Sequence, residues 1–283
     1  LDHIALITSD DFIAPVWDYL EARAHELNVL TKMDPTFITP HSQFLEFHDS
    51  DVLGLDSDLF GSTGLFSQVV AVTRLTETRV QDGFSRWQPS QTSSDDGYKK
   101  IWGHHRGSGS WLPAYRAHGE GILFILNPKR VSTWLEKCGF PTPIKDASEP
   151  TALSYPGVLA HSLAHLIMTR LSYECGYSLP SICDRIYDLP DGRQAFLVYT
   201  AESDIMGTLG GLVDFGDGPK LEELVKGALQ DAIWCSQDPV CIGRVVDAAS
   251  KQAACCHKCL YLPETSCEWM NTHLDRATIV GTK

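Results

Sequence analysis

The sequence predicts an α/β (α+β) protein in which mixed small sheets pack with helices. Three observations support this class. Short runs of β-branched and aromatic residues indicate strands, longer segments with apolar residues every three or four positions indicate helices, and six of the nine cysteines are concentrated between residues 235 and 267. The cysteine-rich end is expected to be a small helical domain of its own.

The predicted elements follow one another along both parts of the chain. The first part should hold a helix over residues 12–30, strands over 68–74 and 119–126, and a short helix over 131–137. The second part should hold a helix over 156–174, another from 178 through 187, a strand over 194–200, and helical segments over 221–233 and 242–254. The helices over 12–30 and 156–174 are predicted from apolar residues that recur at helical spacing.

A proline-rich linker separates the two parts. Pro141, Pro143 and Pro150 fall within eleven residues, and prolines this dense are incompatible with a helix or a central strand. We therefore place a domain boundary near residue 148. Residues 1–148 form an α/β region, and residues 149–283 form a cysteine-rich domain.

Composition restricts the class of protein. Lys and Arg number 23 against 36 Asp and Glu, so the formal net charge is −13. A protein that binds nucleic acid on its own usually has a basic face, so autonomous DNA binding is not expected. No run of eighteen apolar residues occurs, so we expect no membrane span and a cytoplasmic protein.

The cysteine spacing indicates a structural zinc site. Cys256 and Cys259 form a C-x-x-C pair, and Cys235 and Cys241 form a C-x5-C pair upstream. Two residues between thiolates let both sulfurs face one tetrahedral ion, and a second pair completes the coordination. We predict one Zn²⁺ bound by these four cysteines, which makes residues 149–283 a zinc-binding helical domain. With four protein ligands, no position is left for a catalytic water.

The identity of the four ligands leaves alternatives open. Cys255 is adjacent to Cys256 and could take its place, and Cys267 could replace a member of the first pair. Free buried thiols, a redox pair and disulfides are the competing interpretations. Disulfides are not expected, because 283 residues can bury a large core without such cross-links.

Two histidines form a second candidate feature. His161 and His165 lie at positions i and i+4 of the helix over 156–174, hence on one face. Zinc proteases use such a pair with a Glu directly after the first His, but Ser162 stands there. Buried or interface histidines are the main expectation. Metal ligation by the pair stays open, and so does a metal-dependent nuclease or hydrolase that uses both histidines with Asp204.

A series of motifs resembles one known family. In the second part these are residues 161–165 (HSLAH), 174–177 (ECGY), 199–201 (YTA), 207–211 (GTLGG), 234–235 (WC), 238–241 (DPVC), 254–259 (ACCHKC) and 264–268 (ETSCE). Upstream, residues 74–79, 83–84, 111–114 and 119–122 continue the likeness. The order and spacing resemble the C-terminal half of DrmB-like proteins of the DISARM anti-phage system, whose zinc domain also ends MrfA-type helicases. The doubled Cys255-Cys256 departs from the single cysteine expected before His257.

The resemblance implies a non-enzymatic accessory subunit. Such a subunit would bind a helicase-like ATPase of the DrmA type and engage DNA through that complex, with no membrane partner. The sequence contains no P-loop and no complete catalytic motif, in keeping with this role. A metal-dependent nuclease and a direct single-stranded DNA binder are the alternatives.

Overall fold

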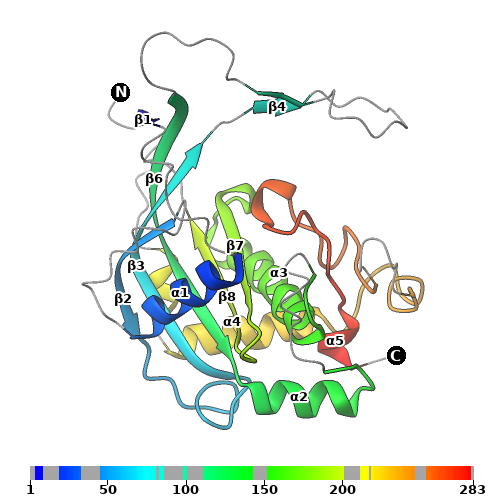
Figure 1. The fold of residues 1–283 in the computed structure, drawn as a ribbon. Helices are drawn as coiled ribbons and strands as arrows, with labels where there is room; N and C mark the ends of the chain where they lie inside the picture. The colour runs from blue at the N-terminus through cyan, green and yellow to red at the C-terminus, as the bar shows by residue number, and fades with distance from the viewer. Residues whose placement is uncertain are drawn as a thin grey trace.

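A six-stranded sheet forms the centre of the protein (Figure 1). The computed structural model describes residues 4–8, 19–32, 45–80, 83–85, 98–100, 111–142, 152–200, 211–216, 218–245 and 253–281. The strands are β1 (Ile4–Thr8), β2 (Leu45–Val52), β3 (Phe66–Val80), β6 (Trp111–Leu126), β7 (Ile182–Asp188) and β8 (Gln194–Thr200). They are ordered β2-β3-β6-β8-β7, with β1 also paired to β6, and every pair is antiparallel.

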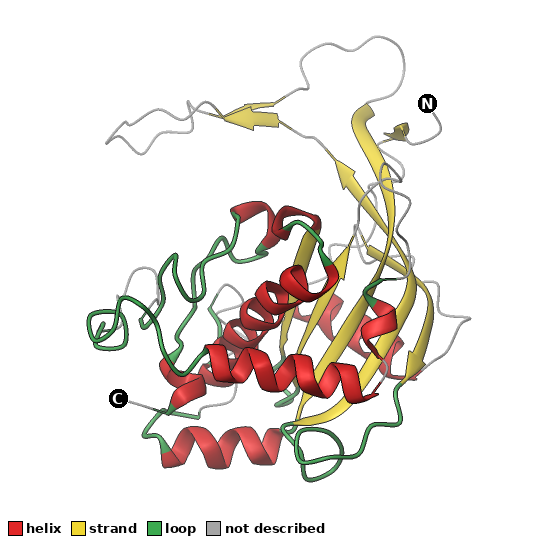
Figure 2. Ribbon diagram, turned by 180° about the vertical axis from the view of Figure 1, so that it is seen from behind, coloured by secondary structure: helices red, strands yellow, loops and turns green. Residues whose placement is uncertain are grey.

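Helices cover both faces of this sheet (Figures 1 and 2). They are α1 (Tyr19–Lys32), α2 (Pro128–Lys137), α3 (Tyr155–Cys175), α4 (Gly218–Asp231) and the short α5 (Ala277–Val280). Three single-turn helices, η2 (Leu179–Ser181), η3 (Val213–Gly216) and η4 (Glu264–Ser266), lie in the connections. A separate hairpin pairs β4 (Gly83–Ser85) with β5 (Tyr98–Lys100). No helix of the described segments is long and apolar enough to cross a bilayer.

The central strands are continuous runs of apolar residues because both faces of the sheet are buried. In β6, Ile122 and Phe124 face the helices α3 and α4, whereas Leu123 faces the opposite side. There it joins Leu27 and Leu30 of α1. Successive side chains of a strand point to opposite faces, so a strand covered on both sides needs apolar residues at every position.

Helix α3 is buried around most of its circumference. Fourteen of its residues are buried, and it packs against β7, β8, α2, α4 and α5. Ser154 caps its N-terminus by accepting a hydrogen bond from the Gly157 N–H at 3.2 Å, while the Asp188 carboxylate accepts from the Ser154 N–H and hydroxyl. A Cβ on Gly157 would lie 2.5 Å from the Asp188 carboxylate, so only glycine permits this close approach.

Most of the predicted elements agree with the structure. The strands over 68–74, 119–126 and 194–200 lie in β3, β6 and β8, and β3 and β6 extend well beyond the predicted ranges. The helices over 131–137, 156–174 and 221–233 correspond to α2, α3 and α4. For the predicted helix over 12–30, residues 19–30 lie in α1 and residues 12–18 are outside the described part.

Two predicted helices are wrong. In the first, residues 179–181 form a single 3₁₀ turn and residues 182–188 form the strand β7. Its buried residues lie on both faces of the sheet, which hides the period of two and leaves an apolar spacing compatible with a helix. In the segment 242–254, the described residues 242–245 and 253–254 form turns and irregular backbone, and residues 246–252 lie outside the described part.

The α+β class is confirmed, but the strands combine into a larger sheet than expected. β6 pairs with β8 from Gly121↔Tyr199 to Ile125↔Ala195, so residues before and after position 148 share one sheet. The predicted C-terminal domain therefore contributes two strands as well as helices. The division into residues 1–148 and 149–283 stays a prediction about the organisation of the chain.

Removing the Leu163 side chain should destabilise the protein markedly. Leu163 lies on α3 and is 1% exposed in the core between α3 and the sheet, so Leu163→Ala leaves a cavity. We expect a loss of about 2–5 kcal/mol in the free energy of unfolding, measured by urea titration. Lys220→Ala on exposed α4 surface is the control and should change it by less than about 0.5 kcal/mol. Equal stability of the two variants would contradict the assigned core.

Candidate metal centre

The structure brings together the four cysteines that the spacing singled out. The Sγ atoms of Cys235, Cys241, Cys256 and Cys259 all lie within 4.8 Å of one another. Individual Sγ–Sγ distances are 3.5 Å for Cys235–Cys256 and 3.7 Å for both Cys241–Cys259 and Cys256–Cys259. Four sulfurs about 2.3 Å from a tetrahedral ion would be ~3.8 Å apart. The donor set and its spacing therefore fit a metal ion, and metal binding by these residues stays a prediction.

Two tight turns hold the four sulfurs. After α4 the chain turns so that the Cys241 N–H bonds to the Gln237 carbonyl at 2.9 Å. In the second turn the Cys259 N–H bonds to the Cys256 carbonyl at 3.1 Å. Backbone N–H groups two residues on, at Gln237 and Lys258, donate to the sulfurs of the first cysteine in each turn at 3.4 Å. Such donors stabilise thiolates, which are the metal-binding form of cysteine.

An ion pair between Asp238 and Arg276 stabilises the first turn. The Asp238 carboxylate accepts hydrogen bonds from the Cys235 N–H at 2.9 Å and the Ile242 N–H at 3.1 Å. Its other partner is Arg276, a fully buried side chain that also donates to the Ala232 carbonyl at 2.9 Å. Despite the cost of desolvation, the Arg276 guanidinium and these N–H groups lower the pKa of Asp238. The C-terminal segment thus fixes the geometry of a turn forty residues earlier in the chain.

The four thiols differ in how readily they lose their protons. Burial raises the pKa of Cys241 to about 11, and burial together with the neighbouring Cys241 thiolate raises the pKa of Cys259. The pKa of Cys256 is lowered, because hydrogen bonds from the Lys258 N–H and the adjacent thiols outweigh burial. Four thiolates at this spacing repel one another, so a divalent cation would supply the missing positive charge.

The alternatives that the sequence left open now have distinct positions. The Cys255 thiol donates to the Tyr261 hydroxyl at 3.6 Å, outside the four-cysteine cluster. Cys267 lies in a different cluster, described below. None of the nine cysteines forms a disulfide, and the Sγ–Sγ distance of 3.5 Å between Cys235 and Cys256 far exceeds the ~2.05 Å of a disulfide.

The second cluster joins His161, His165, Asp184 and Cys267, whose ligand atoms also lie within 4.8 Å of one another. α3 presents both histidines, β7 presents Asp184, and Cys267 follows η4. The interpretation of buried histidines agrees with the structure, since both side chains are 0% exposed. Sequence reasoning missed Asp184, because residues 178–187 were interpreted as a helix. Asp204 of the hydrolase alternative lies outside the described residues.

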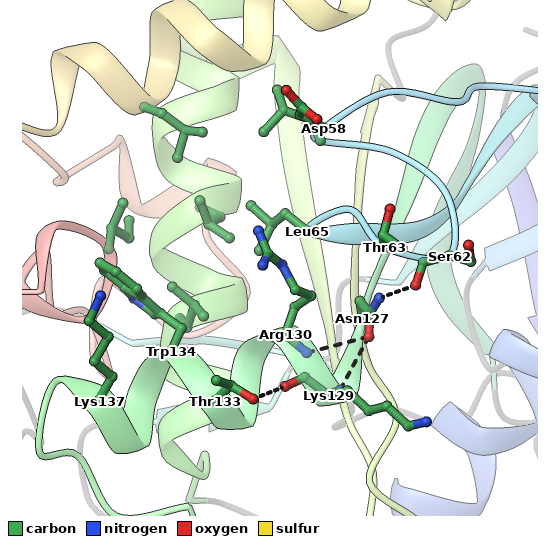
Figure 3. Close-up of a pocket in the computed structure, with 15 residues that line it drawn as sticks. Asp58, Ser62, Thr63, Leu65, Asn127, Lys129, Arg130, Thr133, Trp134 and Lys137 are labelled. Carbon is green, nitrogen blue, oxygen red and sulfur yellow. Dashed lines mark hydrogen bonds between the residues drawn. The ribbon is translucent and has the colours of Figure 1, made fainter.

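A pocket of about 840 Å³ opens beside α2 (Figure 3). Asn127 caps α2 by accepting bonds from the N–H groups of Lys129 and Arg130, and its own amide donates to the Ser62 carbonyl at 2.9 Å. The exposed side chains of Lys129, Arg130 and Lys137 lie along the α2 side of this pocket, Asp58 lies on another side, and Leu159 and Leu163 of α3 form part of the apolar lining. This basic rim contrasts with the acidic average of the chain.

The fold and the site together define a class: an α+β protein with a buried four-cysteine cluster suited to a closed metal centre. No protein-family model matches the chain. The chain is 31% identical to the DISARM protein DrmB of Bacillus paralicheniformis, over 99% of its own length. The predicted resemblance is confirmed, and the chain is DrmB-like along nearly its whole length. It spans about half the length of this curated relative, 53%.

Replacing one cysteine of the cluster should lower the metal content by one ion per chain. In Cys256→Ser or Cys259→Ser, three thiolates remain and the tetrahedral coordination is incomplete, so we expect loss of the ion and loosening of residues 235–259. Mass spectrometry of the purified protein gives the metal content, and limited proteolysis reports the loosening. Cys255→Ser is the matched control, because it removes an adjacent buried thiol outside the cluster. Unchanged metal content in Cys259→Ser would show that the ligands are wrongly assigned.

Proposed function

We propose that the chain is a non-catalytic accessory component of a DISARM-type anti-phage defence complex, located in the cytoplasm. In this role it binds a helicase-like ATPase of the DrmA type and helps that subunit engage DNA. The observation that carries the proposal is the 31% identity to a protein named DISARM protein DrmB, which extends over 99% of this chain. A likeness that extends along almost the whole of this chain favours a shared role over a shared local motif.

A structural Zn²⁺ at Cys235, Cys241, Cys256 and Cys259 is part of the proposal. Zinc is the ion most often found with four thiolates in tetrahedral geometry, and four protein ligands leave no site for water or substrate. The ion would join the turn after α4 to the turn at residues 256–259, two segments with little regular structure between them among the described residues. Its contribution is therefore to folding and not to chemistry.

Apolar side chains next to this centre supply a surface for a protein partner. Trp234 is 70% exposed, and Ile233, Val240 and Val245 are exposed to a similar or greater degree. Ile233 also lines a hollow of about 540 Å³ with Leu229 and residues of α5. Contiguous exposed apolar groups are typical of interaction sites, and Trp is enriched among the residues that dominate binding energy. We assign this surface, residues 233–245, to the ATPase subunit.

Trp234→Ala should weaken the complex with the ATPase subunit while leaving the fold intact. The side chain is mostly exposed, so its loss removes partner contacts and little of the core. We expect at least a tenfold rise in the Kd, equivalent to about 1.4 kcal/mol, measured by titration calorimetry with the purified ATPase. Tyr115→Ala, which removes an exposed aromatic side chain on β6 outside residues 233–245, is the control. An unchanged Kd in Trp234→Ala, with metal content retained, would place the interface elsewhere.

The basic rim of the pocket beside α2 provides a place for contact with DNA phosphates. Lys129 and Arg130 lie in the first turn of α2, and Lys137 lies in its last turn. With a net charge of −13, the chain as a whole repels DNA. A local group of three cations can therefore assist a complex that supplies further contacts, but it does not favour strong binding by the isolated chain.

The double variant Lys129→Glu/Arg130→Glu should weaken DNA binding by the complex in a salt-dependent way. Loss of two phosphate contacts lowers the slope of log K against log salt by about 2. Fluorescence anisotropy with labelled DNA at several salt concentrations measures this slope. Arg193→Glu, on the α1 side of the sheet where Arg193 bonds to Asn28, should leave it unchanged. Equal slopes for both variants would exclude α2 from the DNA interface.

The purified chain and a histidine variant test the enzymatic alternative. Both histidines of the hydrolase hypothesis are fully buried, and their carboxylate partner within the described residues is Asp184, so substrate has no direct access to them. We expect no cleavage of single- or double-stranded DNA by the purified chain with magnesium or manganese. Cleavage that is lost in His165→Ala would overturn the non-catalytic assignment. Tight binding of oligonucleotides by the isolated chain would instead support the direct single-stranded DNA binder.

A further inference from the structure

The cluster of His161, His165, Asp184 and Cys267 carries an inference beyond the proposed function. We infer that these four residues bind a second structural Zn²⁺, separate from the four-cysteine centre. They supply two nitrogens, one oxygen and one sulfur, all of which are ligand types of zinc. The ligand atoms lie within 4.8 Å of one another, and all four residues are buried.

The distances within the cluster fit a tetrahedral ion. The Nε2 atoms of His161 and His165 lie 3.3 and 3.1 Å from Oδ2 of Asp184. His161 Nε2 lies 3.2 Å from the Cys267 sulfur. From typical zinc–ligand bond lengths, two ligands of a tetrahedral ion are ~3.4 Å apart for nitrogen and oxygen and ~3.6 Å apart for nitrogen and sulfur. A small outward movement of each side chain would accommodate the ion.

The outer hydrogen bonds orient both imidazole rings towards the same point. His165 Nδ1 lies 2.7 Å from the Leu260 carbonyl, and His161 Nδ1 lies 3.3 Å from the His273 carbonyl. A carbonyl oxygen only accepts, so Nδ1 is the protonated nitrogen in both rings. In the neutral imidazole, Nε2 then carries a lone pair that faces the other ligands. Metal-binding histidines usually show this arrangement, with the second nitrogen donating to a carbonyl or carboxylate.

The remaining ligands are oriented in the same way. The second oxygen of Asp184, Oδ1, accepts a hydrogen bond from the Glu268 N–H at 2.6 Å. The Cys267 sulfur accepts from the Asn271 N–H at 3.2 Å, as the sulfurs of Cys235 and Cys256 do from backbone N–H groups of their own turns. Each ligand is therefore held on its outer side by a backbone group. On the inner side, two lone pairs of nitrogen, a carboxylate oxygen and a sulfur converge, and a cation balances them.

Protons alone offer a competing arrangement. In it, His165 is an imidazolium paired with Asp184, and the Cys267 thiol donates its proton to His161 Nε2. This network satisfies the same contacts without a metal, but it places an ion pair in a site where both side chains are 0% exposed. Burying such a pair costs several kcal/mol per ion. Zinc would replace the Nε2 proton of His165 and the thiol proton of Cys267 with one divalent charge. Metal content therefore distinguishes the two arrangements.

The position of the cluster indicates a structural role. It joins α3, the edge strand β7 and the C-terminal segment, which contribute two, one and one ligands respectively. Within the described residues 253–281, the regular elements are η4 and α5 alone. With Cys256 and Cys259 in one centre and Cys267 in the other, zinc would fix this segment at two points. The four protein ligands and complete burial leave no open position for catalysis.

Metal analysis of the purified wild-type chain, expressed in medium supplemented with zinc, tests the inference. We expect two zinc ions per chain. The two ions together would have five sulfur ligands and three nitrogen or oxygen ligands, since four cysteines bind one ion and Cys267 binds the other. X-ray absorption at the zinc edge should therefore report half of each number as the average per zinc ion, about 2.5 sulfurs and about 1.5 nitrogen or oxygen atoms. One zinc ion per chain with sulfur ligands only would overturn the inference, and so would a second ion other than zinc.

Variants assign the second ion to its ligands. Cys267→Ser and the nearly isosteric Asp184→Asn should each reduce the content from two zinc ions to one, with the residual ion in all-sulfur coordination. Cys183→Ser is the matched control, because it removes a buried thiol beside Asp184 that belongs to neither cluster, and it should retain two. Two zinc ions in a folded Asp184→Asn would contradict the ligand assignment. The wild-type measurement decides the question even if a variant does not fold.

Discussion

The burial of the C-terminal segment against α3 and the edge of the sheet is the constraint on which much of the structure depends. The described residues 253–281 contain little helix and no strand. Side-chain contacts therefore hold this segment in place. Asp275 accepts from the Ala254 N–H, Arg276 reaches the Ala232 carbonyl, and the Trp134 indole donates to the Thr278 carbonyl at 2.7 Å. These contacts connect α2, α4 and both cysteine turns through one stretch of chain.

Helix α3 makes this arrangement possible because it is buried on most sides. Its apolar residues complete the core over the sheet, and the fully buried Ser162 hydroxyl accepts a hydrogen bond from the Asp275 N–H at 3.0 Å. His161 and His165 project from the same helix towards the C-terminal segment. Polar groups in such surroundings require partners, and here the partners are the backbone of residues 260–275 and the carboxylate of Asp184.

In the proposed function, both cysteine-containing clusters have a structural role. Each is closed by four protein side chains, and most of these side chains are buried. Exposed apolar residues lie beside the first cluster, on the turn that it shapes. A rigid turn presents Trp234 and its neighbours at little entropic cost, which favours association with a partner. In the proposed function, the contact with DNA is made mainly through that partner, because the chain is strongly acidic.

The sequence alone determined features that depend on local spacing. Cys256 and Cys259 can face one ion because two residues separate them, and His161 and His165 share a helix face because of their i, i+4 spacing. The central strands were predictable from their β-branched residues, since both faces of the sheet are buried. The tertiary structure decided what depends on distant segments. It placed Asp184 on β7, next to the histidines of α3. It also placed the Cys255 thiol against the Tyr261 hydroxyl and the Cys267 sulfur beside His161 and His165. Spacing within one segment says nothing about these pairings, because they arise from how strands and helices pack.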